Sequence, residues 1–188
     1  MANINLQFRI ATLDDASRLQ ALVQSAYRGE TSRQGWTTEA DLLTDDRINV
    51  EGIIAKITKP DSAVLLATDD GGALVSCCEI FKRSADVAYF GMFAVDPRRQ
   101  GGGLGRQVLT YTEDYCRRAW GVKKLELGVI WSREELISWY LRRGFRKTGE
   151  SRPFPYEELV NGTTLQDDLH FEVFEKDLNT IPVPAAAA

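Results

Sequence analysis

The apolar positions near the start of the chain predict a short strand followed by a helix. Residues 6–11 read as a strand, and Thr12 with the two acids behind it has the composition of a helix N-terminus. The helix then carries apolar residues at helical spacing, namely Leu19, Leu22, Val23 and Ala26. Gly29 is typical of the end of such a helix.

A polar stretch separates this helix from the next predicted elements. Residues 30–35 are loop-like, and Thr37 or Thr38 is expected to cap a second helix. The apolar residues of that second helix are Leu42 and Leu43. Residues 49–58 add a further helical stretch.

From residue 63 the hydrophobic period changes to that of strands. The runs 63–67 and 73–81 are rich in residues that favour strands, and the sequence Asp-Asp-Gly-Gly at 69–72 predicts a hairpin between them. Residues 87–95 form the next predicted strand.

A long helix, a buried strand and a further helix follow. The long helix ends at Gly121 and has one apolar face, made by Leu104, Val108, Tyr111, Tyr115 and Ala119. Residues 125–130 have the continuous apolar pattern of a buried strand, and residues 132–143 read as a helix. The last predicted strands are residues 145–150 and 169–176. The connection 152–168 is too long for a tight hairpin, and such loops commonly carry ligand contacts.

Length and composition indicate an ordinary single-domain protein. The chain has 188 residues, of which 44% are hydrophobic and 27% charged, which suits one domain with a substantial core. We assign residues 1–178 to that domain and residues 179–188, which end in four alanines, to a disordered tail. The net charge of −4 gives no general attraction to nucleic acid or to anionic membranes.

Several functional classes are disfavoured by what the sequence lacks. No stretch approaches the ~18 apolar residues of a membrane span, and the first residues do not have the pattern of a secretory leader. The three cysteines, at 77, 78 and 116, fit no zinc spacing and no disulfide framework. We therefore expect a cytoplasmic protein without a metal site.

The turn between strand 87–95 and the long helix predicts an anion site. Its glycines let backbone N–H groups approach a ligand closely, and the helix N-terminus adds unpaired donors and a positive dipole end. Arg98, Arg99 and Arg106 surround the turn with positive charge, so a pyrophosphate would fit. A Walker loop would need Gly-Lys-Ser/Thr at its end, and a dinucleotide fingerprint would need glycine in place of Arg106.

The spacing Gln100-x-x-Gly103-x-Gly105, followed by Arg106, resembles the acetyl-CoA pyrophosphate loop of GNAT superfamily N-acetyltransferases. Residues 140–145, Tyr-Leu-Arg-Arg-Gly-Phe, resemble the Tyr-x-x-x-Gly-Phe ending of the family's last motif. The predicted element order over about residues 6–177 is also that of the GNAT fold. The resemblance implies an α/β (mixed α+β) fold with a strongly twisted mixed sheet and helices on both faces.

The resemblance implies acetyl-CoA as the acetyl donor. Phe93, Ala94 and Val95 would pair through their backbone with the pantetheine arm. The pyrophosphate would be held by Gln100, Gly101, Gly102, Gly103, Leu104, Gly105 and Arg106. Arg133 replaces a common family asparagine, so that residue's pantetheine contact is not carried over; Arg133 would reach a CoA phosphate, a substrate carboxylate or solvent.

Two residues are the candidates for proton transfer. Tyr140 matches the family tyrosine that often lies beside the CoA sulfur and acts as general acid; its alternative role is packing in the core. Glu79 is the candidate base, accepting a proton through water, because it is an acid within an apolar strand run. Glu126 has the same pattern, and a solvent-facing strand position is the alternative for both.

The sequence favours an N-acetyltransferase that moves an acetyl group from acetyl-CoA to a primary amine of a small molecule or peptide, by direct transfer in a ternary complex. Residues 28–47 and 152–168 are expected on the acceptor side. The alternative is a non-catalytic acyl-CoA-binding module that senses the cosubstrate or contacts other proteins. No nucleic-acid or membrane partner is expected, and a monomer or a homodimer would fit.

Overall fold

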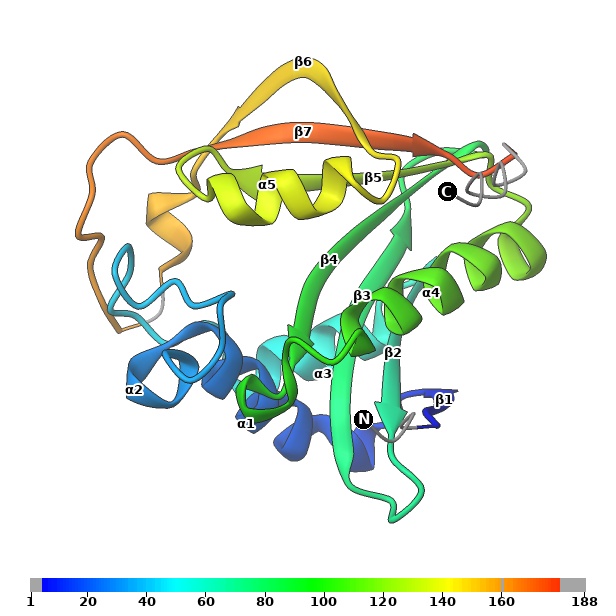
Figure 1. The fold of residues 1–188 in the computed structure, drawn as a ribbon, viewed down its shortest axis with the longest axis horizontal. Coiled ribbons are helices and arrows are strands. Elements are labelled where there is room, and N and C mark those ends of the chain that lie inside the picture. Colours follow the sequence, from blue (N-terminus) through cyan, green and yellow to red (C-terminus); the bar gives the residue numbers. More distant parts are fainter. Residues whose placement is uncertain (1–4, 160, 180–188) are drawn as a thin grey trace, which may run out of the picture.

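One mixed sheet of seven strands runs through the described part of the molecule (Figure 1). The computed structural model describes residues 5–159 and 161–179. The strands are Gln7–Ile10 (β1), Ser62–Thr68 (β2), Leu74–Lys82 (β3), Val87–Val95 (β4), Lys124–Ile130 (β5), Arg146–Pro153 (β6) and His170–Asp177 (β7). Their spatial order is β1-β2-β3-β4-β5-β7-β6, and the pairing is antiparallel except between β4 and β5.

Helices cover both faces of this sheet. They are Ala16–Tyr27 (α1), Gly29–Ser32 (α2), Val50–Thr58 (α3), Leu104–Trp120 (α4) and Glu134–Leu141 (α5). Side chains alternate across a strand, so β2 feeds two cores: Leu65 packs with residues of α4 and α5, whereas Leu66 packs with residues of α1 and α3. The mixed α/β fold with helices on both faces is thus confirmed.

β4 and β5 separate soon after they begin, and this gap prepares the site. Their parallel pairing covers only Val87–Tyr89 against Lys124–Glu126, and the two strands diverge beyond it (Figure 1). Met92 has a φ of 46°, which marks an irregularity in β4 at this point. From Gly91 onwards, therefore, the edge of β4 that faces β5 has no strand partner within the described residues.

Most predicted elements are present, but the prediction of a second helix containing Leu42 and Leu43 is wrong. Residues 37–48 contain no helix; instead Leu43 forms an isolated antiparallel bridge with Thr164, and the N–H of Leu165 donates to the carbonyl of Leu42 over 2.8 Å. Leu43 is 2% exposed and packs in a small core with Ile130, Phe154 and Leu169. The long loop before β7 supplies the backbone partners Thr164 and Leu165, so the segment pairs with that loop instead of forming a helix.

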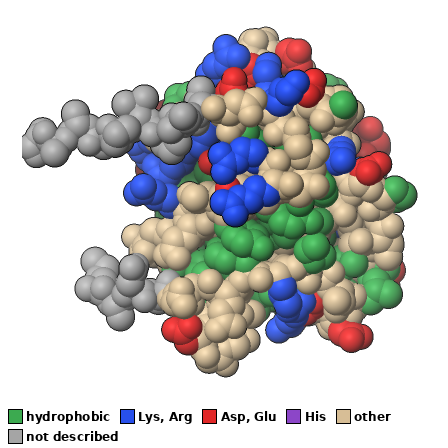
Figure 2. Space-filling model, turned by 90° about the vertical axis from the view of Figure 1, so that its right-hand side faces the viewer, with side chains coloured by type: hydrophobic (Ala, Val, Ile, Leu, Met, Phe, Trp, Pro, Cys, Tyr) green, Lys and Arg blue, Asp and Glu red, His purple; other side chains and the backbone are tan. Residues whose placement is uncertain are grey.

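The single domain of residues 1–178 and the disordered tail of residues 179–188 stay predictions. Of the expected tail, residues 179–188, only Asn179 falls within the described residues. No described helix has the length and apolar character needed to cross a membrane. The face of the molecule in Figure 2 carries lysine and arginine side chains with acidic ones beside them, around a hydrophobic area.

Candidate functional site

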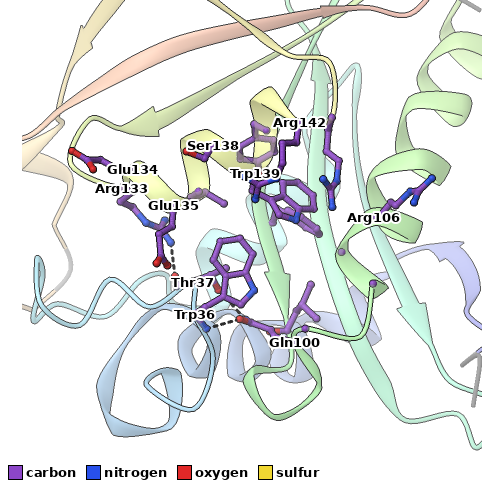
Figure 3. Close-up of a pocket in the computed structure, with 18 of the residues that line it drawn as sticks. Trp36, Thr37, Gln100, Arg106, Arg133, Glu134, Glu135, Ser138, Trp139 and Arg142 are labelled. Atoms are coloured by element: carbon purple, nitrogen blue, oxygen red, sulfur yellow. Dashed lines mark hydrogen bonds between the residues drawn. The ribbon is translucent and has the colours of Figure 1, made fainter. Parts of the chain in front are cut away.

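A cavity of about 700 Å³ opens where β4 and β5 diverge, between the β4–α4 turn and α5 (Figure 3). This volume is typical of a small-molecule or cofactor site. Among the predicted cosubstrate residues, those that line it are Phe93, Val95, Gln100, Gly101, Gly103, Gly105 and Arg106. Ala94 faces β3, where its carbonyl accepts a hydrogen bond from Ser76 Oγ, and Leu104 is buried in the core. Gly102 does not line the cavity either.

The β4–α4 turn presents backbone donors to the cavity. Gly101 and Gly103 have φ of 86° and 80°, in the left-handed region that glycine adopts at little cost. Gly103 precedes the first residue of α4, and Gln107 N donates to its carbonyl over 3.2 Å. The N–H groups in the first turn of the helix therefore have no acceptor within the helix. Such unpaired donors are the groups that bind anions at helix N-termini.

The expected basic cluster has different members in the structure. Arg98 and Arg99 are paired with Asp96 and Asp69, at 2.8 and 2.7 Å, so they do not supply free charge to the turn. Apart from Arg133, which pairs with Glu39, three other arginines line the cavity: Arg106, Arg142 and Arg143. None of the three has an acidic partner within the described residues.

The positive charges of Arg106, Arg142 and Arg143 lie close enough to repel one another, as the surroundings of Arg143 show. Its guanidinium lies 4.5 Å from the centre of the Trp139 ring, and its Nε is buried without a partner. Burial, followed by repulsion from Arg106 and Arg142, lowers the pKa of Arg143. An anion at this end of the cavity would relieve that repulsion. Arg142 and Arg143 could not be predicted as ligand-binding residues from the sequence, because they fall at variable positions of the family motif.

Tyr140 lies in α5. Its ring packs in the hydrophobic core, and the residue also lines the cavity. It is 5% exposed and meets Trp139 and Phe145 edge to face, with ring centroids 5.0 and 5.5 Å away. Within the described residues no side-chain hydrogen bond involves its hydroxyl. Burial raises the pKa of Tyr140 well above its usual value, so the phenol keeps its proton at neutral pH.

Neither candidate base lines the cavity. Glu79 is only 4% exposed, so the solvent-facing alternative is wrong for it, but its carboxylate is held by Lys56 Nζ at 2.6 Å. It stands opposite Gly91, next to the irregularity in β4. Glu126 lies between Arg83 and Arg152 as their salt-bridge partner.

Arg133 lines the cavity and also belongs to a buried ionic network. Its Nη1 lies 2.6 Å from Glu39 Oε1, while Arg28 Nη1 lies 2.6 Å from Glu39 Oε2 and Arg28 Nε 2.7 Å from Asp45. Burial disfavours the charged form of Glu39, but attraction by its arginine neighbours outweighs burial and lowers the pKa of Glu39. The network ties α5 to the segment that follows α2.

Two more side chains fix the cavity walls: Gln100 joins the glycine turn to that segment, and Tyr27 joins α1 to β4. Gln100 Oε1 accepts from the backbone N–H of Trp36 at 2.9 Å, and Gln100 Nε2 donates to Thr37 Oγ1 at 2.8 Å and to the Val95 carbonyl at 3.1 Å. Tyr27 donates its hydroxyl to the Phe93 carbonyl over 2.6 Å. The carbonyls of both β4 residues thus point to the cavity side of the strand.

Comparisons with known proteins agree with this arrangement. The family model described as "Acetyltransferase (GNAT) family" matches residues 19–145, whereas no curated protein matches the sequence. Among solved structures, the spermidine N-acetyltransferase from Vibrio cholerae in complex with CoA and spermine superposes with a TM-score of 0.66 at 16% identity, covering 92% of this chain and 95% of that one.

Two further structures have similar statistics. A Vibrio cholerae spermidine/spermine N-acetyltransferase with manganese ions gives a TM-score of 0.64 at 16% identity, covering 92% of both chains. A protein assigned provisionally as a phosphinothricin N-acetyltransferase gives 0.66 at 16% identity, covering 94% of this chain and all (100%) of that one. These likenesses concern the fold, and the family match covers well over half of the chain. The chain therefore belongs to the acetyltransferase (GNAT) family, a family of acetyl-CoA-dependent N-acetyltransferases.

Proposed function

We propose that the chain transfers an acetyl group from acetyl-CoA to a primary amine of a small molecule or peptide, directly and within a ternary complex. The observation that carries the proposal is the cavity itself. At one place it combines an edge of β4 and three arginines that have no strand or acidic partner in the described part of the chain with the backbone donors at the start of α4. These are the features that a long, polyanionic thioester needs.

The phosphates of acetyl-CoA match the β4–α4 end of the cavity. The N–H groups that open α4 would bind the pyrophosphate, and Arg106, Arg142 and Arg143 would bind the remaining phosphate charge. The pantetheine arm matches the free edge of β4. The carbonyls of Phe93 and Val95 are already bonded to Tyr27 and Gln100, so the N–H groups of these residues, which point the same way, are the donors left for it.

Acetyl-CoA supplies an acetyl thioester, whose acetyl group passes to the amine nitrogen while the thiolate leaves. Tyr140 would hold a proton at its phenol oxygen for the departing sulfur, since burial keeps the phenol protonated. The amine proton must leave by another route. Glu79 would accept it only through water, because its carboxylate is bound by Lys56 and does not line the cavity.

The acceptor would enter at the end of the cavity opposite the arginines. Thr37 lies there near the first turn of α5, whose Glu134 and Glu135 also line the cavity, and Trp36 adjoins it beside Gln100 and Trp139 (Figure 3). Two exposed carboxylates beside an aromatic ring attract a protonated amine. The similar Vibrio cholerae structure holds spermine together with CoA, which supports a cationic amine as acceptor.

The test is thiol release from acetyl-CoA across a panel of amines: spermidine, spermine, free amino acids, an aminoglycoside and a short peptide. We expect turnover with at least one cationic amine, and loss of turnover when its amine is acetylated beforehand. Tight binding of acetyl-CoA without thiol release for any amine would contradict the proposal and favour a non-catalytic acyl-CoA-binding module.

A further inference from the structure

Gln100 holds a distant segment of the chain in place. Its side-chain amide bonds the backbone N–H of Trp36 and the hydroxyl of Thr37, which lie more than 60 positions earlier, and also the carbonyl of Val95, the last residue of β4. One side chain therefore joins the end of β4, the glycine turn and residues 35–39. We call residues 35–39 the acceptor-side segment.

Gly35 shows how closely the two parts approach. A Cβ at this position would lie 2.5 Å from Gln100 Oε1 and 2.9 Å from Gln100 Nε2, so only glycine leaves room for the amide. Because three hydrogen bonds fix that amide, it cannot move aside without losing some of them.

The opposite wall of the cavity holds the same segment. Arg133, just before α5, donates to the Thr37 carbonyl and pairs with the buried carboxylate of Glu39. Trp36 is thereby kept beside Trp139, with ring centroids 6.4 Å apart (Figure 3). The acceptor-side segment thus spans the cavity, with one anchor on the turn and one on α5.

We propose that Gln100 is a positioning residue that couples the glycine turn to the acceptor-side segment, so that acetyl-CoA and the amine bind cooperatively. The inference rests on the proposed function. Gln100 directly precedes Gly101, so a ligand that fixes the N–H groups of the turn also fixes the Gln100 backbone. Its amide then holds Trp36 and Thr37 where the amine would enter. By reciprocity, a bound amine strengthens acetyl-CoA binding by the same factor.

The test is hydrogen exchange in a peptide covering residues 30–42, measured with and without saturating acetyl-CoA. In the wild-type protein we expect acetyl-CoA to slow exchange in this peptide by about fivefold or more, the lower end of usual couplings between sites. In Gln100→Ala the peptide should exchange faster and lose its response at acetyl-CoA concentrations that saturate the variant, because the Gln100 amide bonds protein groups and the backbone of the turn is kept. Gln34→Ala, an exposed glutamine in the same peptide, is the matched control and should respond like wild type.

A second variant tests the inference without altering Gln100. Gly35→Ala should displace the amide and reproduce the loss of response, with a higher KM for the amine and little change in kcat. In a protein that already carries Gln100→Ala, the added Gly35→Ala should change nothing further, since the atoms it would strike are gone. Additive effects of the two substitutions would overturn the inference.

The failure of this inference differs from failure of the proposed function. If acetyl-CoA does not raise the melting temperature of wild type, the proposed function fails. If acetyl-CoA binds but wild type shows no slowing in the peptide, or Gln100→Ala responds as wild type does, only the coupling through Gln100 is refuted.

Discussion

Tyr140 combines a buried ring with a place on the cavity wall. Its ring packs against Trp139 and Phe145, so the position of the phenol oxygen is set by core packing and not by a hydrogen bond to protein. A rigid phenol without a hydrogen-bond partner in the described chain has its proton available for a departing thiolate. Packing and catalysis are therefore compatible roles for one side chain.

Tyr140→Phe removes only the phenol oxygen. We expect it to keep acetyl-CoA binding and to lower turnover on the active amine by about 10²-fold, the usual contribution of a general acid. The measurement is kcat across a pH profile, with Tyr111→Phe as control because Tyr111 stacks on Phe8 away from the cavity. Turnover within about threefold of wild type, with chemistry limiting, would exclude the hydroxyl as a needed acid.

Glu39 is the residue on which the buried ionic network depends. Glu39→Gln leaves Arg133 without its carboxylate and Arg28 with only Asp45, so we expect a loss of about 3–5 kcal/mol in the free energy of unfolding. Urea unfolding measures it. Glu30→Gln, at an exposed surface pair, should change stability by about 0.5 kcal/mol or less. Equal effects of the two substitutions would contradict this role.

The same carboxylate predicts a pH dependence of stability. The pKa of Glu39 is lower in the folded protein than its ordinary value of 4.5, so folding favours the ionised form. Its stabilisation is complete above the unfolded pKa and is lost as the pH falls through the folded pKa. The stability difference between wild type and Glu39→Gln should therefore shrink below about pH 4.5. A difference that stays constant down to pH 3 would contradict it.

At the scale of elements, the proposed recognition of acetyl-CoA depends on the β4–α4 unit. Gly103 is left-handed with open space where a Cβ would point, so a side chain there strains the backbone by about 1–2 kcal/mol and projects from the turn. Gly103→Val should fold and yet lose stabilisation by acetyl-CoA. The control is Gly72→Val in the β2–β3 hairpin. Gly72 has a φ of 79°, so this variant has the same backbone strain, but it should still be stabilised by acetyl-CoA. Undiminished stabilisation of Gly103→Val by acetyl-CoA would refute the assignment.

Elements whose pattern is local could be predicted, and those that depend on distant partners could not. The strand 87–95 coincides with β4, because its apolar run and the glycines behind it lie together in sequence. The helix expected near Leu42 is absent because Leu43 finds its bridge partner at Thr164, about 120 positions away. The anchoring of Arg133 by Glu39 and of Gln100 by Trp36 depends on the same kind of long-range contact.

At the scale of the whole molecule, the divergence of β4 and β5 creates the cavity, and the cavity has two ends of different charge. Arg106, Arg142 and Arg143 gather at the end nearest the glycine turn, whereas Glu134 and Glu135 stand at the other, as Figure 3 shows for the labelled side chains. The net charge of −4 gave no sign of this polarity, because only the fold separates the two groups. An anionic donor and a cationic acceptor would each find a complementary end.

The most direct measurement is the thermal stability of the wild-type protein with acetyl-CoA. A ligand that binds only the native cavity should add about 2.7 kcal/mol at 100 times its dissociation constant. We predict a clear rise in melting temperature with acetyl-CoA and with CoA, and a much smaller one with ATP or NAD at the same concentration. No rise with acetyl-CoA or CoA, together with a clear rise with ATP or NAD, would contradict the assignment of this cavity to acetyl-CoA.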